Sequence, residues 1–482
     1  MLQVDLLIRN ADTAASSGQT FARHDPMTAK IASRAAAATV ADANAAADAA
    51  ADAFPAWSAI GPGERRALLL AAADMLEHRV DDAVSRMMSE TGATAPWAQF
   101  NTMLAAGMLR EAAALTTQVT GEVIPSDKPG CLAMSFRQPV GVVLGIAPWN
   151  APIILAVRAI AAPLACGNTV VLKASETCPA THRLVGEVMR DAGFAPGVVN
   201  VVTNAPVDAP KIVETLVAHP AVKRINFTGS TKVGRIVAEL AAHHLKPVLL
   251  ELGGKAPLIV LDDADLEGAV NGAAFGAFAN QGQICMSTER LVVDEIVADA
   301  FVAKLAAKAS ALPAGDPTGH VVIGPVIGPE AADRIESLIR DATAKGAVLA
   351  AGGRREGNIL SATVLDRVTP AMRLYGEESF GPVVCVVRVR GVDEAVRVAN
   401  DTEYGLAASV YGRDVMRALS VAKRIQSGIC HVNGPTVQDE AQMPFGGMKA
   451  SGHGRFGGKA VIDQFTDLRW ITIEDSQQAY PF

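Results

Sequence analysis

The sequence has 482 residues, of which 50% are hydrophobic and 19% are charged. This length exceeds what one hydrophobic core usually supports, so the composition predicts a globular protein of two or more lobes and excludes disordered and fibrous proteins. The formal net charge is −7, from 43 Lys and Arg against 50 Asp and Glu. A mildly acidic chain without a basic stripe argues against a nucleic-acid partner.

No apolar run reaches the roughly 18–20 residues that a membrane span needs. The first residues include Asp5, Arg9 and Asp12, unlike the start of a signal peptide. We therefore expect a cytoplasmic protein without a membrane partner. The six cysteines show neither CxxC pairing nor the spacing of a zinc site, so we expect free thiols, most of them buried, and no bound metal.

Helices are expected first in chain order. One begins at Thr39, which can cap it together with Asp42, and its alanine-rich pattern over residues 40–54 is expected to end at Pro55. Apolar residues at three- and four-residue spacing predict the next two helices at residues 62–79 and 95–115.

Short apolar runs then alternate with helical patterns, which predicts a parallel, doubly wound sheet. The runs are residues 140–146, 169–172, 198–202, 224–227 and 248–250, and the helical stretches between them include residues 152–165, 180–192 and 212–218. A second alternation extends from residue 257 to about residue 437. The change of pattern near residues 250–256 is the expected domain boundary.

One cysteine follows a polar segment at the end of a predicted helix. The helix covers residues 264–278, and Asn280, Gln281 and Gln283 precede Cys285. Flexible polar residues at a helix end are expected to expose backbone N–H groups and to leave a thiol accessible. Nucleophilic cysteines need exposure, a lowered pKa or a nearby base, and donors for an oxyanion. Taken alone, the segment fits a buried loop cysteine equally well.

Two further polar side chains stand at the ends of predicted strands. Glu251 ends an apolar run, and the paired glycines Gly253 and Gly254 are expected to give mobile backbone behind it, which suits a general base with a raised pKa. A Glu at a strand end is more often solvated or ion-paired. Asn150 closes the first run, and its amide can donate to an oxyanion, although it fits a turn equally well.

Together these segments resemble the aldehyde dehydrogenase superfamily. Five motifs occur in the order and approximate spacing of that family and cover essentially the whole chain. They are Pro148-Trp149-Asn150, Phe227-Thr-Gly-Ser-Thr231, Glu251-Leu-Gly-Gly-Lys255, Gly282-Gln-Ile-Cys285 and Glu377-Glu-Ser-Phe-Gly-Pro382. The joint match is highly specific.

The resemblance implies an α/β fold with two doubly wound parallel-sheet domains and a small β oligomerisation element. Residues 1–117 and 139–250 are expected to form the NAD-binding domain, residues 251–440 the catalytic domain, and residues 118–138 and 462–482 an oligomerisation arm and tail. The strand-like run at residues 469–473 has few residues after it, so we expect it to pair outside its own domain or in another subunit. A homodimer or homotetramer follows from the same resemblance.

The resemblance also assigns the catalytic roles. It implies that Cys285 is the nucleophile, that Glu251 activates the deacylating water, and that Asn150 forms an oxyanion hole with the backbone N–H of Cys285. An aldehyde cannot expel hydride into water, whereas a thiolate adduct can deliver it to an adjacent nicotinamide. The resulting thioester is open to hydrolysis, so one difficult oxidation becomes two easier steps.

The implied cofactor is NAD. Its phosphates are expected near Gly229, Ser230 and Gly234, at the start of a helix, where free N–H groups favour an anion; helix capping by Ser230 is the alternative. Lys173 and Glu176 resemble the residues that hold the adenine ribose, and a carboxylate there repels a 2′-phosphate, which favours NAD over NADP. An ion pair between the two is the alternative. The remaining expected cofactor contacts are Ile146, Trp149, Glu378 and Phe380.

Gly452-His-Gly-Arg-Phe-Gly457 satisfies the G-x-G-x-x-G pattern of dinucleotide-binding loops. It lacks the strand before it and the βαβ unit that this fingerprint requires. We interpret it as a loop that brings Phe445 to the substrate side.

Four peptides look similar to bacterial salicylaldehyde and vanillin dehydrogenases, and so does the C-terminal Tyr480-Pro-Phe482. The four are Gln283–Arg290, Gly434–Ala441, Met443–Gly447 and Gly454–Gly458. This similarity implies an aromatic aldehyde such as salicylaldehyde, benzaldehyde or vanillin. A flat ring needs an apolar slot with one polar group for a ring hydroxyl.

The candidate slot combines apolar and aromatic side chains with one arginine. Ile284 and Met286 flank the nucleophile and can form walls, and Trp97 and Phe445 are candidate aromatic faces. Arg158 lies on the helix after Asn150, where many relatives carry a bulky aromatic residue. We expect it to donate to the ring substituent or lie against it; a salt bridge unrelated to substrate is the alternative.

Rival interpretations remain open at this point. A vanillin, benzaldehyde or broad-range aldehyde dehydrogenase would use the same residues. A CoA-acylating dehydrogenase would keep Cys285, although relatives that use CoA commonly lack the Glu251 base. A non-catalytic binding protein on the same fold is disfavoured because Cys285, Glu251 and Asn150 are all retained.

Overall fold

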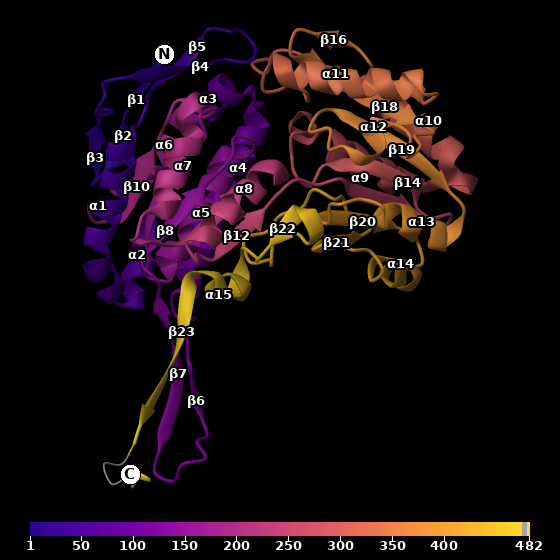
Figure 1. The fold of residues 1–482 in the computed structure, drawn as a ribbon. Helices are drawn as coiled ribbons and strands as arrows, with labels where there is room; N and C mark the ends of the chain where they lie inside the picture. The colour runs from indigo at the N-terminus through magenta and orange to yellow at the C-terminus, as the bar shows by residue number, and fades with distance from the viewer. Residues whose placement is uncertain (475–479) are drawn as a thin grey trace.

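The computed structural model describes residues 1–474 and 480–482 (Figure 1). Short, buried runs of Val, Ile and Leu form the central strands of its first sheet. The strand order is β22-β12-β11-β8-β9-β10-β2-β3. The five central strands run parallel, whereas β2, β3 and β22 pair antiparallel at the edges. The strands are β2 (Leu6–Ile8), β3 (Ala11–Thr13), β8 (Val142–Ile146), β9 (Thr169–Lys173), β10 (Val199–Val202), β11 (Val222–Thr228), β12 (Val248–Glu251) and β22 (Gly452–His453).

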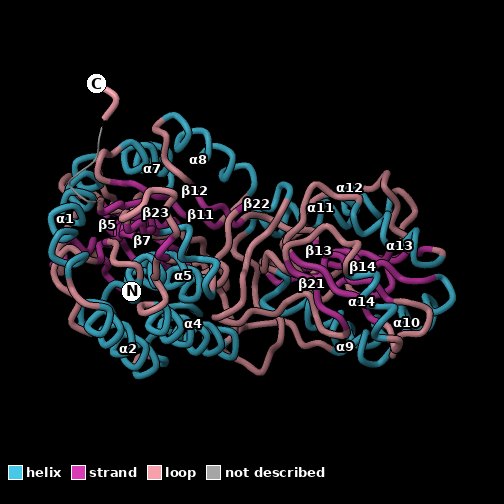
Figure 2. The backbone as a smooth tube through the Cα atoms, turned by 90° about the horizontal axis from the view of Figure 1, so that it is seen from below, coloured by secondary structure: helices cyan, strands magenta, loops and turns pink. Residues whose placement is uncertain are grey.

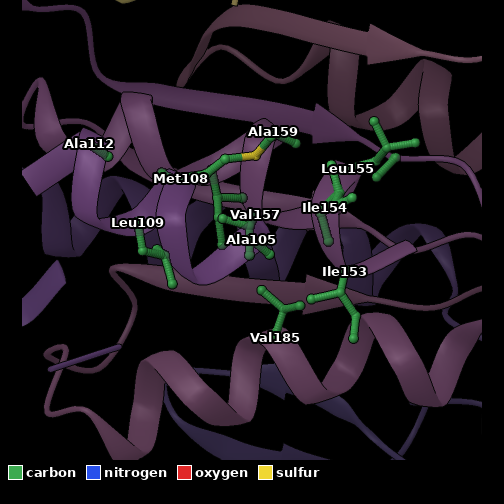
Figure 3. Packing of buried hydrophobic residues seen from close by; sticks show 14 of the residues in the cluster. Ala105, Met108, Leu109, Ala112, Ile153, Ile154, Leu155, Val157, Ala159 and Val185 are labelled. Carbon is green, nitrogen blue, oxygen red and sulfur yellow. The ribbon is translucent and has the colours of Figure 1, made fainter. Parts of the chain in front are cut away.

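Helices cover both faces of this sheet (Figure 2). One face packs against α1 (Val40–Ala59), α7 (Ala209–Ala218) and α8 (Thr231–His243). The other packs against α5 (Pro152–Ala165) and α6 (Pro179–Asp191). These two helices are covered in turn by α2 (Pro62–His78), α3 (Val80–Thr91) and α4 (Ala95–Leu115). Small residues such as Ala105 and Ala112 bring α4 close to α5, and Val185 of α6 packs beside them (Figure 3).

The second lobe holds a seven-stranded sheet of order β15-β18-β19-β14-β13-β20-β21, parallel except at β15. The strands are β13 (Ala256–Val260), β14 (Thr288–Asp294), β15 (Val348–Ala351), β18 (Thr363–Asp366), β19 (Val383–Val389), β20 (Ala407–Tyr411) and β21 (Ile429–Val432). α9 (Leu266–Phe278) and α10 (Glu295–Ala311) cover one face, and α11 (Pro329–Ala344), α13 (Gly391–Asn400) and α14 (Val415–Ala422) cover the other. The doubly wound arrangement predicted from the alternation is confirmed in both lobes.

A three-stranded arm projects from the first lobe (Figure 1). It consists of β6 (Glu122–Ile124), β7 (Leu132–Pro139) and β23 (Thr466–Ile473), in the order β23-β7-β6. The strand-like run near the C-terminus therefore pairs with the arm of its own chain. Part of the expected tail, residues 475–479, lies outside the described residues.

The five N-terminal strands were not predicted, because their short, mixed sequences show no clear period of two. Two of them, β2 and β3, extend the first sheet. β1 (Leu2–Val4), β5 (Ile31–Ala36) and β4 (Thr20–His24) form a separate sheet in the order β1-β5-β4. Within the part of the chain that the structure describes, no helix has both the length and the apolar character needed to cross a bilayer.

The predicted end of the first helix is wrong. Thr39 caps α1 with Asp42 as expected, but the helix continues past Pro55 to Ala59. Proline removes one backbone N–H, which leaves the carbonyl of Ala51 without its helical donor. Ala51 is partly exposed, so water can solvate that carbonyl, and Trp57 is buried against Phe194 with 5.4 Å between the ring centroids. Tertiary packing therefore outweighs the local cost of proline.

This explanation predicts opposite effects for two neighbouring substitutions. Trp57→Ala should lower the free energy of unfolding by about 3–5 kcal/mol, as for other buried tryptophans. Pro55→Ala should not lower it, because the substitution restores a helical donor. Urea unfolding of both variants measures the difference, and an equal loss in the two would contradict the explanation.

Candidate active site

Three polar segments meet at the carboxyl edge of the first sheet. From β8 the chain proceeds to β9 and β10 on one side, and it returns to β11 and β12 on the other. Such a reversal opens a crevice at the carboxyl ends of the strands. The loop after β8 carries Trp149 and Asn150, β11 leads to Gly229, and β12 ends at Glu251.

The cysteine loop is rigid rather than flexible. After α9 the chain makes a 3-10 turn (Ala279–Gly282) in which Asn280 and Gln281 adopt left-handed φ angles of 46° and 55°. These residues are buried, because Gln281 donates to the carbonyl of Pro325 at 3.2 Å and Asn280 donates to that of Asn150 at 3.0 Å. The prediction that this polar segment is exposed is therefore wrong, because its side chains donate to backbone carbonyls inside the protein.

The glycines after Glu251 serve close packing rather than mobility. Both are buried, and a Cβ on Gly254 would lie 2.2 Å from the carbonyl oxygen of Cys285. A Cβ on Gly253 would lie 2.8 Å from the carboxylate of Glu378, a less severe contact because it involves the end of a side chain. The absence of side chains thus lets the Glu251 segment contact the backbone of the cysteine loop.

Asn150 is tied to the same loop. Its Nδ2 donates to the carbonyl of Gln283 at 3.0 Å, and its own carbonyl accepts from Nε1 of Trp97 at 3.2 Å. Asn150 and Cys285 both line one large cavity. The structure therefore brings Cys285, Glu251 and Asn150 together from three distant parts of the sequence.

The cavity has a volume of about 980 Å³ and a mostly apolar lining. It contains all of the predicted substrate residues, namely Trp97, Arg158, Ile284, Met286 and Phe445. Sequence reasoning missed Phe100 and Phe275, whose half-exposed rings also border the cavity, and Asp439. Their sequence context gives no signal, because only the packing of the two lobes brings them to one cavity.

Arg158 is buried at the wall of the cavity. Its Nη2 forms an ion pair with Asp439, and its guanidinium lies over the Phe445 ring, 4.2 Å from the centroid. The salt bridge considered as an alternative is thus present, and it holds the arginine beside the cavity rather than away from it. A guanidinium has five N–H donors in a fixed fork, so one partner does not use its whole donor capacity.

Glu251 is near Cys285 and is only 1% exposed. Among the described residues, neither of its buried carboxylate oxygens has a hydrogen-bond donor in ordinary geometry. Burial raises the pKa of Glu251 to about 8, although the charge of Arg158 and the Cys285 thiol partly offset the shift. The group is therefore poised to exchange a proton near neutral pH.

The thiol of Cys285 is also poorly solvated. The residue is partly exposed toward the cavity, but desolvation and the nearby charge of Glu251 raise its pKa well above the usual value. At neutral pH a thiol of this kind keeps its proton. The other cysteines are free as well; Cys166, Cys178 and Cys385 are buried, while Cys131 and Cys430 are partly exposed.

Glu378 and Phe380 form a second group of candidate site residues, in contact with Gly254 and Trp149. Gly254 donates its backbone N–H to Glu378 at 2.8 Å, and burial raises the pKa of Glu378 to about 7. Phe380 has a left-handed φ of 46°, and its ring meets Trp149 edge-on at 5.7 Å. Bulky residues rarely adopt such a φ, and strain of this kind gathers at functional sites.

The residues expected to hold the phosphates and the ribose also make the contacts that were considered as alternatives, a helix cap and an ion pair. Ser230 caps α8 by accepting from the N–H of Val233 at 3.4 Å, and Lys173 pairs with Glu176. The first turn of α8 carries Lys232 and no acidic residue, so its positive end still suits a phosphate. Glu176 remains partly exposed and accepts from Asn204 at 2.8 Å. Ile146 ends β8 beside these segments.

The G-x-G-x-x-G segment does not lie in a βαβ unit, and part of it is a strand rather than the expected loop. β22 (Gly452–His453) pairs antiparallel with β12, and Gly452 stands opposite Glu251. A Cβ there would lie 2.1 Å from the carbonyl of Leu250. Phe445 and Phe456 pair by an isolated antiparallel bridge, which places Phe445 at the cavity wall.

Comparisons with known proteins agree with this geometry. The model of the aldehyde dehydrogenase family matches residues 13–471. The chain is 62% identical to a vanillin dehydrogenase from Pseudomonas fluorescens and 52% identical to a salicylaldehyde dehydrogenase from Pseudomonas putida, with complete coverage of each pair. A crystal structure of a salicylaldehyde dehydrogenase from Pseudomonas putida G7 complexed with salicylaldehyde superposes with a TM-score of 0.99 at 51% identity, over 100% of both chains.

Proposed function

The chain belongs to the aldehyde dehydrogenase family, and we propose from this premise that it oxidises aromatic aldehydes to carboxylates with NAD. One observation carries the proposal: Cys285 lines a large, mostly apolar cavity, and its thiol interacts with the buried carboxyl group of Glu251. The named relatives act on salicylaldehyde and vanillin, and a flat ring suits the aromatic and aliphatic walls of the cavity. Salicylaldehyde is the proposed substrate, with vanillin and benzaldehyde as the alternatives.

The proposed chemistry starts at the thiol. The sulfur of Cys285 attacks the aldehyde carbon to form the anion of a thiohemiacetal, and the thiol proton passes to solvent. Nδ2 of Asn150 and the backbone N–H of Cys285 donate to the oxygen that becomes negative. Bound NAD supplies the acceptor for the hydride that this carbon loses, which leaves a thioester on Cys285. Glu251 then takes a proton from a water molecule, and the oxygen of that water attacks the thioester carbon. The bond to sulfur breaks, which releases the carboxylate and frees Cys285.

The residues that would hold NAD are those on the sheet side of Cys285. The positive start of α8, with Gly229, Ser230 and Gly234, would hold the phosphates, and Ile146 and Trp149 border the same crevice. Glu378 and Phe380 would orient the nicotinamide half. Lys173 and Glu176 would hold the adenine ribose, and the Glu176 carboxylate favours NAD over NADP because it repels a 2′-phosphate.

The projecting arm supports a homodimer or homotetramer. Val123, Leu468 and Trp470 on its strands are 74%, 61% and 75% exposed, and such apolar surface usually marks an interface. We place the assembled protein in the cytoplasm.

A substrate panel tests the proposal directly. Salicylaldehyde, vanillin, benzaldehyde and an aliphatic aldehyde are each assayed with NAD and with NADP. Aromatic aldehydes with NAD should give the highest kcat/KM, and preference for the aliphatic aldehyde or for NADP would contradict the assignment. Reduction of NAD that depends on added CoA would instead favour acyl transfer to CoA.

Cys285→Ala should abolish oxidation because no thioester can form. The cofactor crevice does not depend on the sulfur, so NAD binding should persist, which quenching of tryptophan fluorescence by NAD can measure. Residual oxidation above about 1% of the wild type would contradict the role of the nucleophile, since covalent catalysis has no substitute here.

Glu251→Gln should slow the second half of the reaction. A general base contributes about 10²–10⁴-fold, so we expect a small burst of NADH followed by slow turnover. The base works only when deprotonated, and the pKa of Glu251 is raised to about 8. The wild-type kcat should therefore rise with pH through about 8 and then level off. A Gln variant that keeps this rise would show that another group titrates.

Arg158→Ala should affect hydroxylated rings most. We propose that an N–H of Arg158 that is not paired with Asp439 donates to the ring hydroxyl of salicylaldehyde, and a hydrogen bond from a charged donor contributes about 1.5–3 kcal/mol. The kcat/KM for salicylaldehyde should fall about tenfold or more relative to that for benzaldehyde. Equal losses for the two substrates would leave Arg158 only the structural role of an ion-pair partner.

A further inference from the structure

A buried ion pair lies behind the candidate active site. Nζ of Lys255 is 2.7 Å from Oε2 of Glu289, and the two side chains are 0% and 4% exposed. Lys255 follows Glu251 by four residues, and Glu289 follows Cys285 by four residues. The pair therefore joins the segment of the proposed base to the segment of the proposed nucleophile.

The same pair holds a third segment. Glu289 accepts from the backbone N–H of Ser379 at 2.9 Å, from its hydroxyl at 2.7 Å, and from the N–H of Phe380 at 3.0 Å. Lys255 donates to the carbonyl of Glu377 at 2.7 Å. One carboxylate and one ammonium thus bind three backbone groups of this segment: the carbonyl of Glu377 and the N–H groups of Ser379 and Phe380.

Phe380 is the strained member of this segment, with its left-handed φ of 46°. Such a conformation persists only where neighbouring groups over-determine it. Its N–H is bound by Glu289, its ring rests edge-on against Trp149, and the preceding Glu378 accepts from Gly254 at 2.8 Å. The carboxylate of Glu289 is therefore placed where it can hold the backbone of Phe380 in this conformation.

We propose that Glu289, paired with Lys255, is a positioning residue that fixes the Glu378–Phe380 segment relative to Cys285. This rests on the proposed function, in which that segment orients the nicotinamide half of NAD. Buried ion pairs are weak evidence for stability, since apolar replacements are often neutral, but they can specify one arrangement of the chain. Here the pair would fix the Cys285 sulfur relative to the nicotinamide, and both must reach the carbonyl carbon of the aldehyde.

The experiment compares two reactions of Glu289→Gln. NADH formation in a single turnover needs the cofactor segment to be in place, whereas hydrolysis of 4-nitrophenyl acetate without cofactor needs only the thiol and the base. All groups that contact Glu289 are donors, so the glutamine amide loses at least one of these hydrogen bonds. A shift of about 1 Å can cost about 10²-fold, so we expect NADH formation to fall about 10–100-fold while ester hydrolysis stays within about threefold.

Glu90→Gln is the matched control. Glu90 is equally buried and accepts from Ser33 and from the backbone of Ala180 and Thr181, far from Cys285 in the sequence and outside the cavity. It should lower thermal stability without separating the two reactions. A parallel loss of both reactions in Glu289→Gln, or a loss no greater than that of Glu90→Gln, would overturn the proposal.

Ser379→Ala provides a second test that keeps the ion pair intact and removes only the hydroxyl donor. It should reduce NADH formation by about threefold or more and leave ester hydrolysis unchanged, and an unchanged rate of NADH formation would contradict the proposal even if Glu289→Gln failed to fold. Failure of the proposed function itself has a different signature. In that case the wild type would neither reduce NAD nor hydrolyse the ester, or Cys285→Ala would retain both activities.

Discussion

The arrangement of this protein depends on one costly interaction, the burial of the Glu251 carboxylate beside the Cys285 thiol. A carboxylate without a donor is unfavourable in a protein interior, and it responds by binding a proton more tightly. The surrounding structure fixes the position of Glu251. β11 and β22 pair with the strand that ends at this residue, and the glycines that follow pack closely against their neighbours. The result is a carboxyl group with its pKa raised to about 8 next to a thiol whose pKa is also raised.

The two lobes contribute opposite ends of their sheets to this interaction. Glu251 closes β12, and Asn150 follows β8, both at carboxyl ends in the first lobe; Cys285 instead precedes β14, at the amino end of a strand in the second. Contacts that cross between the lobes, such as Asn150 to Gln283, set their distance. The C-terminal segment adds Phe445 and Asp439 to the cavity wall and β22 to the sheet. The proposed nucleophile, the proposed base and the cavity therefore depend on how the lobes pack, not on either lobe alone.

Much of this architecture could be predicted from the sequence, because periodic apolar patterns identify strands and helices. The alternation predicted the two parallel sheets. The shared motifs pointed to Cys285, Glu251 and Asn150, and predicted helices added Trp97 and Arg158 to the cavity candidates. Three features were beyond local reasoning. Pro55 is tolerated because Trp57 is anchored by Phe194, which lies far away in the sequence. Asn280 and Gln281 are buried because distant carbonyls accept from them. Asp439 and Glu289 were missed because charge in a sequence says nothing about which partners folding will bring within reach.

The central claim is that Cys285 forms a covalent bond to the substrate, and that Glu251 then activates the water that breaks this bond. Mass spectrometry of Glu251→Gln, quenched with acid after mixing with benzaldehyde and NAD, tests it most directly. The account predicts one aroyl group per chain, attached to the peptide that carries Cys285 and absent when NAD is omitted. An unmodified chain at a time when NADH has already formed, or a group attached to another cysteine such as Cys430, would contradict it.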